Sequence, residues 1–385
     1  MPKASKLKDI LYFQQNTTFG LTERYLSYLA RGAYRCGYNV NLMFPDVPEM
    51  RRFEEMGGDG VCFHGLPSAP DTGNLVRLLP MILNMFRHLK PDLIHFNDPA
   101  VAGLLAGRMY RHADLVVTHH TPELNRRYGW RGQLLDRLAF GGRPFVIFTS
   151  DNDRETGIER DGIREEDSTV IPYGIDASSF NKRHDRNGIC GELGVPPGHR
   201  IVGNVARLAP QKGHGYLIEA AKTVLSLDSN VTFVVVGDGA LRDQLLDKVA
   251  RAGLVGRFLF AGQRSDVPRL LSVFDLFVMP SLFEGLCMAV LEAYAAGVPV
   301  VATPVGGVPS SVIEGETGKL VQPRDANALG GAILWMLKHP EKARDMGLRG
   351  RRRVEKQFTL AAMLADTQAI YERLLSRRES KAELA

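Results

Sequence analysis

The stretch MPSLFEGLCMAVLEAYAAGVPVVATPVGG, residues 279–307, contains the end of an apolar strand, a loop, a nearly all-apolar helix and a second apolar strand. Short β-rich runs separated by a helical segment are typical of a parallel βαβ unit, whose strands are buried on both faces. The stretch therefore predicts an α/β fold built on a doubly wound parallel sheet.

The same alternation of strands and helices extends over most of the chain. It is interrupted at residues 181–200 by a polar stretch rich in Gly and Pro, which is typical of a connection. We therefore predict two Rossmann-like domains, residues 1–180 and 186–357, facing a cleft at the carboxyl ends of their strands. The predicted strands are residues 10–14, 40–44, 61–64, 93–96, 115–119 and 145–149, then 201–206, 233–237, 258–262, 276–280 and 298–303.

Composition supports a folded, soluble protein. The chain has 385 residues, of which 44% are hydrophobic and 24% charged. No apolar run reaches the length of a membrane span, and charges interrupt the N-terminal segment where a signal peptide needs its apolar region. The four cysteines lie far apart, which argues against a disulfide framework or a zinc site. These features predict a cytoplasmic protein.

The net charge of +5 is spread among acidic residues instead of forming a basic stripe. This argues against nucleic acid as a partner. The cluster of Arg126, Arg127 and Arg131 leaves one minor hypothesis open, a peripheral contact with an anionic membrane on its inner face. A solvated surface is the simpler interpretation of these arginines.

Two carboxylates stand out in the opening stretch. Glu284 precedes the helix, and Glu292 lies more than two turns away inside it, so each must meet a different part of an extended ligand. A carboxylate within a nearly all-apolar helix needs a partner. The helix begins near Cys287, and its N-terminal N–H groups form a potential anion site.

Two cations follow the first strand of the second predicted domain. Arg207 and Lys212 are five residues apart, in a short loop before a helix. Such a pair suits a diphosphate, because Arg binds as a fork and Lys as a point charge. Solvated loop cations are the alternative.

The first predicted domain offers a weaker signal. His119 and His120 end a strand, and successive side chains of a strand point to opposite faces, so the two are not expected to bind one metal. Structural histidines are the alternative. Gly20 lies between the first strand and the first helix, where a backbone can approach a ligand closely.

Four motifs together resemble the retaining glycosyltransferases of family 4, which have the GT-B fold. They are VIPYGID (170–176), ARLAPQKG (206–213), VVVGDGALRDQL (234–245) and FEGLCMAVLEA (283–293), the last with Glu284 and Glu292 in an E-x7-E arrangement. The resemblance covers essentially the whole chain. It implies transfer of a sugar from a nucleoside-diphosphate sugar to a hydroxyl acceptor, with a glycan or lipid-linked glycan as the expected acceptor, with retention at the anomeric carbon and with no metal or other cofactor.

The resemblance also implies roles for the charged residues. Arg207 and Lys212 would hold the donor diphosphate, Glu292 would bind the nucleotide ribose, and Glu284 would contact hydroxyls of the donor sugar. His120 would lie beside that sugar and support the transition state. UDP is favoured over GDP as the nucleotide.

Further donor contacts are implied through the main chain. Gly20 and Leu21 would lie by the diphosphate and the acceptor. Gly285, Leu286 and Cys287 belong to the donor site, the last two through N–H groups offered to phosphate oxygens. The stretch 260–266, with Gln263 and Arg264, would meet the base. In GT-B proteins the closing helix returns to the first domain, so residues 359–385 are expected to complete it.

This sequence departs from the family pattern at three positions. The N-terminal loop has one glycine, Gly20, in place of two, Tyr173 stands where Asn is commoner, and Ala206 precedes Arg207 where Gly is usual. None of these changes affects a charged residue of the implied site.

Three alternatives remain. An NAD-dependent oxidoreductase is suggested by Gly237 and Gly239 after a strand, but Arg242 stands where the dinucleotide fingerprint needs Gly or Ala. A metal-dependent transferase is suggested by Asp151 and Asp153, although Ser150 and its neighbours fit better as helix-capping residues. A non-catalytic nucleotide-sugar-binding protein of the same fold is the third.

Overall fold

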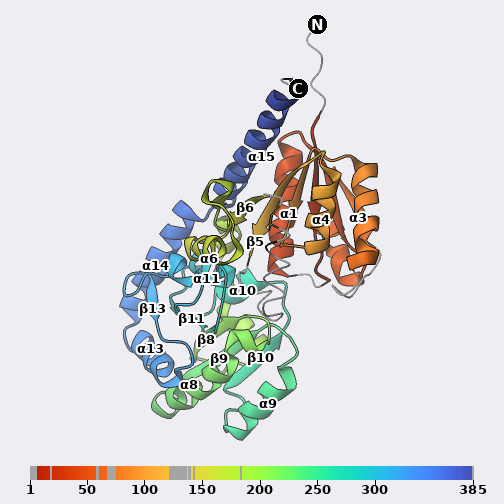
Figure 1. Ribbon diagram of the computed structural model, residues 1–385. Coiled ribbons are helices and arrows are strands. Elements are labelled where there is room, and N and C mark those ends of the chain that lie inside the picture. The colour runs from red at the N-terminus through yellow and green to blue at the C-terminus, as the bar shows by residue number, and fades with distance from the viewer. Residues whose placement is uncertain are drawn as a thin grey trace. The chain divides into compact units, whose positions relative to one another are not determined.

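The computed structural model describes residues 7–17, 20–57, 60–66, 75–120, 137, 140–141, 144–182 and 184–383. The chain divides into two compact units (Figure 1). Unit 1 consists of Met1–Pro172 and Ala361–Ala385, and unit 2 of Tyr173–Leu360.

Unit 1 is built on a parallel sheet of seven strands in the order β3-β2-β1-β4-β5-β6-β7. The order reverses between β1 and β4, and ligands of open α/β sheets bind beyond the carboxyl ends of strands at such a switch point. The strands are β1 (Asp9–Phe13), β2 (Asn39–Pro45), β3 (Val61–Leu66), β4 (Leu93–Phe96), β5 (Asp114–His119), β6 (Phe145–Phe148) and β7 (Ser168–Val170).

The helices of unit 1 pack on a core of strand side chains, among them Leu11, Phe13, Ile94 and Phe96. Among the described residues, short 3-10 helices are η1 (Pro48–Arg51) and η3 (Glu165–Asp167). The α-helices are α1 (Leu21–Arg35), α2 (Arg52–Gly57), α3 (Leu75–Leu89), α4 (Val101–Tyr110), α6 (Asp151–Asp161) and the long C-terminal α15 (Leu360–Glu383), seen at the blue end of the chain in Figure 1.

Helix α15 is held in unit 1 by a buried polar contact. The Tyr371 hydroxyl lies 2.5 Å from His95 Nδ1 and donates to the Tyr12 hydroxyl at 3.2 Å. His95 Nε2 lies 2.7 Å from the Thr118 hydroxyl, so both ring nitrogens of this buried histidine have partners. The last helix therefore joins strands β1, β4 and β5 by hydrogen bonds.

Unit 2 is built on a parallel sheet of six strands in the order β10-β9-β8-β11-β12-β13, with its switch point between β8 and β11. Its core gathers Val202, Phe233, Val235 and Val278 from the strands. The strands are β8 (Arg200–Val205), β9 (Val231–Val236), β10 (Phe258–Gly262), β11 (Leu276–Met279), β12 (Val300–Ala302) and β13 (Gly318–Leu320).

The helices of unit 2 alternate with these strands. The 3-10 helices are η4 (Ala177–Phe180) and η5 (Pro210–Lys212). The α-helices are α7 (Arg186–Leu193), α8 (His214–Leu227), α9 (Arg242–Arg251), α10 (Val267–Leu271), α11 (Met288–Ala295), α12 (Val308–Ser311), α13 (Ala326–Lys338) and α14 (Pro340–Gln357).

The predicted fold class, two Rossmann-like parallel-sheet units, is confirmed, and each predicted strand is present within two residues of its predicted ends. Two edge strands were missed, β7 (Ser-Thr-Val) and β13 (Gly-Lys-Leu), because three residues with little apolar content carry no strand pattern. The interpretation of residues 181–200 as a connection was wrong in part. It contains α7, which the Asp185 side chain caps at its start and left-handed Gly194 ends.

Candidate active site

In unit 2 the predicted site residues gather at the switch point of the sheet. Arg207 follows β8 and Lys212 ends η5, while Glu284 follows the neighbouring strand β11. Arg207 is exposed, whereas Lys212 is half-buried and Glu284 is buried. Lys212 and Glu284 are therefore largely withdrawn from water, whereas Arg207 faces it.

Lys212 and Glu284 form an ion pair that sequence reasoning did not foresee. The Lys212 Nζ donates to Glu284 Oε1 at 2.6 Å, and the exposed fractions of the two side chains are 17% and 7%. The buried hydroxyl of Ser281 donates to the same oxygen at 2.6 Å. A buried carboxylate with two donors is held in one orientation, so Glu284 is a fixed acceptor at this edge.

The loop that carries Glu284 is attached to the loop that carries Lys212. The Leu282 N–H donates to the Gln211 carbonyl oxygen at 2.7 Å, and the Gln211 side-chain amide donates to the Phe283 carbonyl oxygen at 3.0 Å. Gln211 was not among the predicted residues, although it lies next to Lys212. The two loops therefore hold the ion pair as one assembly.

Glycines allow a third loop to approach Glu284. Gly306 has a left-handed φ of 54°, and a Cβ atom there would lie 1.6 Å from the Glu284 carbonyl oxygen. The Gly307 N–H donates to the Gly285 carbonyl oxygen at 3.3 Å. Only a residue without a side chain fits at position 306, which explains Gly306.

Helix α11 begins at the predicted place, with Cys287 as its N-cap residue. Leu286, Cys287 and Glu292 are all buried. Burial and, secondarily, the nearby Glu284 raise the pKa of the Cys287 thiol to about 12. The thiol is therefore neutral near pH 7 and is not an activated nucleophile.

The predicted base-binding stretch is anchored by an ion-pair network. Gln263 is exposed, but the guanidinium of Arg264 donates to Asp266 at 2.7 Å and to Glu192 at 2.6 Å. Arg269 bonds the same two carboxylates, and the hydrogen bond from Arg264 is the main cause that lowers the pKa of Asp266. The Arg264 side chain is thus occupied within the protein, which leaves main-chain groups of this loop for a ligand.

The glycines of VVVGDG have a packing role. Gly237 has a φ of 137°, and a Cβ there would lie 2.1 Å from the Ala206 carbonyl oxygen. Gly239, with a φ of 157°, would bring its Cβ within 2.6 Å of the Leu208 carbonyl oxygen. Both glycines let the loop after β9 lie against the loop that carries Arg207, so they need no dinucleotide to explain them.

In unit 1 the ends of β1, β4 and β5 converge on His120. Its Nε2 lies 2.9 Å from Oδ1 of Asn97, and the ring of Tyr25 meets the imidazole edge to face at 5.1 Å. His120, Asn97 and Tyr25 are all buried. Burial, with smaller effects from His119 and His95, holds the pKa of His120 well below its usual range. His120 is therefore neutral near pH 7.

His119 points away from this group, as strand geometry predicted. Its ring lies 6.2 Å from that of Phe140 and 5.5 Å from that of Phe148, in the apolar core. Burial lowers the pKa of His119 to about 4. The prediction that the two histidines serve different faces is confirmed, and the structural alternative holds for His119.

Gly20 and Leu21 lie at the start of α1, where Gly20 is the N-cap residue. The Gly20 N–H donates to Glu23 Oε2 at 2.8 Å, so this group is already bonded within the protein. The backbone at Gly20 is not left-handed, having a φ of −148°. The Gly20 N–H is thus directed at Glu23 and does not face a ligand.

A second carboxyl lies at the same edge and was missed by sequence reasoning. Asp98 follows β4, has a φ of 153° and accepts a hydrogen bond from the Asn16 amide at 3.4 Å. Its Oδ1 is buried and has no hydrogen-bond partner within the described ranges. Burial and the nearby Glu23 raise the pKa of Asp98 to about 8.

Asp151 and Asp153 begin α6. The Ser150 hydroxyl accepts from the Asp153 N–H at 3.2 Å, which confirms the predicted capping role of Ser150. Asp151 is exposed and Asp153 is buried, so the two side chains do not share one environment. In the described part of the chain no three His, Cys, Asp or Glu side chains are grouped as metal ligands.

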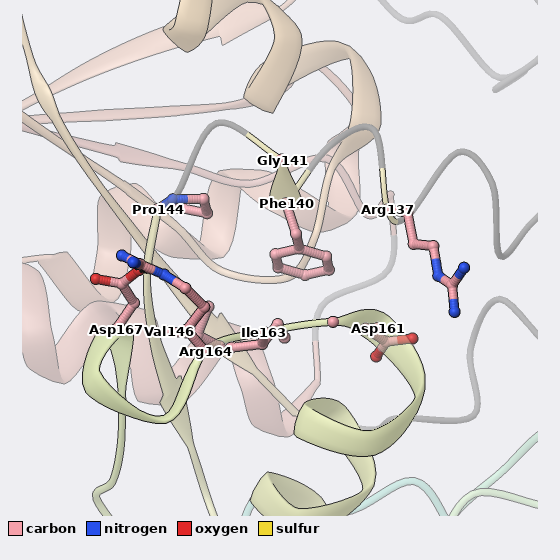
Figure 2. A pocket seen from close by; sticks show the side chains of 10 residues that line it. Arg137, Phe140, Gly141, Pro144, Val146, Asp161, Ile163, Arg164 and Asp167 are labelled. Atoms are coloured by element: carbon pink, nitrogen blue, oxygen red, sulfur yellow. Dashed lines mark hydrogen bonds and ion pairs between the residues drawn. The ribbon is translucent and has the colours of Figure 1, made fainter.

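A pocket of about 280 Å³ lies elsewhere in unit 1 (Figure 2). Phe140, Val146 and Ile163 contribute its apolar lining, and Arg164 and Asp167, which are hydrogen bonded to each other, line it too. None of the predicted site residues lines this pocket. Arg126, Arg127 and Arg131, on which the membrane hypothesis depends, lie outside the described residues, and no helix of the described ranges has the length and apolar character needed to cross a membrane.

Comparisons with known proteins identify the family. The family described as Glycosyl transferases group 1 matches residues 186–353, and that described as Glycosyltransferase Family 4 matches residues 22–179. The chain is 32% identical over 215 residues to the lipopolysaccharide core biosynthesis mannosyltransferase LpsB of Rhizobium meliloti, a match that covers 54% of this chain and 61% of that protein.

Two further comparisons cover more of the chain. The UDP-Gal:alpha-D-GlcNAc-diphosphoundecaprenol alpha-1,3-galactosyltransferase of Escherichia coli is 28% identical over 77% of this chain and 79% of its own length. The crystal structure of Anabaena Alr3699/HepE in complex with UDP and glucose is similar with a TM-score of 0.82 and 26% identity, over 95% of this chain and 98% of that one. With its two parallel-sheet units and its match to both family descriptions, the chain belongs to the GT-B glycosyltransferases of family 4.

Proposed function

We propose that the protein transfers a sugar from a nucleoside-diphosphate sugar, with UDP as the favoured nucleotide, to a hydroxyl of a glycan or lipid-linked glycan, with retention at the anomeric carbon. The observation that carries this proposal is the Lys212–Glu284 ion pair at the switch point of unit 2, with exposed Arg207 five residues before Lys212 on the same loop. The names of two relatives support the donor class, because HepE was crystallised with UDP and glucose and the Escherichia coli enzyme uses UDP-Gal.

The charges of unit 2 suit the donor. Arg207 and Lys212 are proposed to neutralise the diphosphate, together with the N–H groups of Leu286 and Cys287 at the start of α11. Lys212 has three N–H donors and Glu284 takes one, so the ammonium group can hold a phosphate oxygen and the carboxylate together. Because these groups balance the phosphate charge, no metal ion is required by the proposal.

The two carboxylates of unit 2 are proposed to recognise the sugars of the donor. Glu284, fixed by Lys212 and Ser281, would accept from hydroxyls of the transferred sugar, and Glu292 from the nucleotide ribose. Gly285, Gln263 and Arg264 would add contacts through their main chain. Unit 2 is thus the proposed donor-binding unit, and unit 1, completed by α15, the acceptor-side unit, with Gly20, Leu21 and His120 contributing to the donor site.

Retention is proposed to follow from attack on the same face as the leaving group. The acceptor hydroxyl oxygen forms the new bond to the anomeric carbon, the bond to the diphosphate oxygen breaks, and the hydroxyl proton passes to that phosphate. Neutral His120 would hydrogen-bond to the sugar as charge develops. A product of inverted configuration, seen in the anomeric proton couplings, would overturn this part of the proposal.

A thermal-shift screen with UDP, GDP, ADP and TDP tests the donor class. A nucleotide present at about 100 times its Kd stabilises the fold by roughly 2.7 kcal/mol, and we expect the largest rise in Tm with UDP. The screen is run with and without EDTA, which should leave the UDP shift unchanged. Absence of any shift with all four nucleotides would contradict the proposed function, and a shift seen only with a divalent metal would contradict metal independence.

A further inference from the structure

A chain of buried hydrogen bonds links the Glu23 carboxylate to His120. The Gln14 amide nitrogen lies 2.5 Å from Glu23 Oε1, Asn97 Nδ2 lies 3.0 Å from Gln14 Oε1, and His120 Nε2 lies 2.9 Å from Asn97 Oδ1. All four side chains are at most 3% exposed. The chain joins helix α1 to the ends of β1, β4 and β5, and none of Glu23, Gln14 and Asn97 has a role in the proposed reaction.

The Glu23 carboxylate, at one end of this series of hydrogen bonds, can only accept. Besides Gln14, the Glu23 carboxylate receives the Gly20 N–H at 2.8 Å and the Thr22 hydroxyl at 2.9 Å. Three donors on one carboxyl group match its ionised form. Gln14 must therefore point its amide nitrogen at Glu23, and its carbonyl oxygen is left to face Asn97.

The orientation of Asn97 is fixed twice. Its Nδ2 donates to Gln14 Oε1 and, at 3.0 Å, to the main-chain carbonyl oxygen of Thr22. If the Asn97 amide were reversed, its oxygen would face two other oxygens, Gln14 Oε1 and the Thr22 carbonyl oxygen, and both hydrogen bonds would be lost. The Asn97 oxygen must therefore face His120, and His120 Nε2 must carry the proton that it accepts.

From this arrangement we infer that Glu23 is a positioning residue, which acts through Gln14 and Asn97 to fix His120 as the Nε2–H tautomer. In a neutral imidazole Nδ1 then holds the lone pair and acts as the acceptor nitrogen. The edge-to-face contact with Tyr25 resists rotation of the ring. Resting on the proposed function, this makes His120 a neutral member of the site, with Nε2–H directed at Asn97 and Nδ1 as its acceptor nitrogen.

The inference is tested by reading the tautomer directly, in the full-length protein labelled with 15N-histidine. Long-range 1H–15N correlation spectra distinguish Nε2–H from Nδ1–H imidazoles, and the signal lost in His120→Ala assigns His120. We expect the Nε2–H pattern in the wild type. In Glu23→Gln the new amide cannot accept from Gly20, Thr22 and Gln14 together, which lets the Gln14 amide reverse and removes one of the two groups that orient Asn97, so we expect a mixed pattern.

Ser27→Ala is the matched control. The buried Ser27 hydroxyl donates to the Glu23 carbonyl oxygen at 3.0 Å, on the same helix but outside the chain of bonds to His120. Its loss should lower stability and leave the tautomer as in the wild type. If Glu23→Gln does not fold, Gln14→Leu breaks the same chain one residue nearer to His120 and is measured in its place.

Turnover gives a second reading. Loss of a carboxylate that sets a catalytic tautomer directly costs roughly 10⁴-fold in kcat. Because Glu23 acts through two amides, we expect kcat of Glu23→Gln to fall about 10- to 100-fold with little change in the donor KM. An Nδ1–H pattern in the wild type, or an unchanged pattern in the variant, would overturn the inference. A tautomer switch in a protein that turns over no donor would leave it standing and contradict the proposed function instead.

Discussion

The two units hold polar groups at their switch points in opposite ways. Unit 2 uses formal charge, with Lys212 and Glu284 paired at 2.6 Å and Arg207 exposed nearby. Unit 1 uses neutral groups, a histidine held by an asparagine and a glutamine amide, and this series of hydrogen bonds ends at the Glu23 carboxyl group. One Rossmann-like frame can therefore supply either strong electrostatic binding or fixed hydrogen-bond direction, depending on the side chains at the carboxyl end of each strand.

The largest effect should come from removing a charge from the site of unit 2. Lys212→Ala removes a cation aimed at a developing diphosphate charge, and loss of such a group costs about 10²–10³ in turnover. Steady-state kinetics with the preferred donor measures it. Lys222→Ala, which removes an exposed lysine paired with Glu219 on α8, is the matched control and should keep wild-type kcat. Equal activity in both variants would mean that Lys212 serves only Glu284.

A second variant tests whether the Glu284 loop must be held in place. Gly306→Ala forces a Cβ into the Glu284 carbonyl oxygen and a side chain into a left-handed backbone. We expect a loss of about 3 kcal/mol in the free energy of unfolding, from roughly 1–2 kcal/mol of backbone strain plus overpacking, together with weaker donor binding.

Gly315→Ala is the control for that variant, because it has a similar φ of 72° with open space around the Cβ position. Only the backbone strain applies there, so a loss of about 1–2 kcal/mol in the free energy of unfolding is expected. Urea unfolding of the two variants measures the difference. Equal losses would show that the loop moves aside without cost.

In unit 1, whose polar groups are mainly neutral, Tyr371→Phe tests how α15 is anchored. The change leaves His95 Nδ1 buried without its partner and removes the bond to Tyr12. An unsatisfied buried polar group costs about 1–3 kcal/mol, and we expect the free energy of unfolding to fall by that amount. Tyr34→Phe, at an exposed tyrosine of α1, should change it by no more than about 0.5 kcal/mol. An unchanged stability of Tyr371→Phe would mean that α15 is held by its other contacts, among them the hydrogen bonds from Gln368 to Tyr38 and from Arg378 to the Asp92 carbonyl oxygen.

The last prediction concerns the dependence of stability on pH. The pKa of His119 is about 4 in the folded protein and 6.5 in the unfolded chain, so below pH 6.5 only the unfolded chain takes up this proton. Stability is therefore lost as the pH falls from 6.5 toward 4, by up to about 1.4 kcal/mol per pH unit for this group. His119→Phe should reduce the pH slope of the unfolding free energy by that amount, as measured by urea titrations at pH 7, 6 and 5. An unchanged slope would show that His119 is protonated in place.

Sequence reasoning was most successful where chemistry lies close together along the chain. Apolar runs typical of strands predicted both sheets, and Lys212 and Glu284 were singled out because each lies in a motif that follows a buried strand. The capping residue Asp185 and left-handed Gly194 were local signals for α7 that the polar composition of the segment concealed. Gln211 had no such signal, because its role depends on the carbonyl oxygen of Phe283 in another loop.

The hydrogen-bond network of unit 1, from Glu23 to His120, could not be predicted from sequence patterns. The fold brings together three strand ends, which carry Gln14, Asn97 and His120. An asparagine or a glutamine at the end of a strand is common and forms no recognisable sequence motif. The direction of each hydrogen bond depends on all partners at once, including the main-chain oxygen of Thr22. Tertiary structure is needed to see that Glu23 is connected to His120.

The contact between Tyr371 and His95 also has a consequence for synthesis on the ribosome. Unit 1 needs residues from both ends of the chain, so it cannot be completed until all of unit 2 has been translated. At about 5–20 residues per second, the first part of unit 1 waits roughly 10–40 s for α15. During that interval the surface formed by Tyr12 and His95 is uncovered. Nascent chains should therefore bind chaperones there, and release should coincide with the emergence of the final helix.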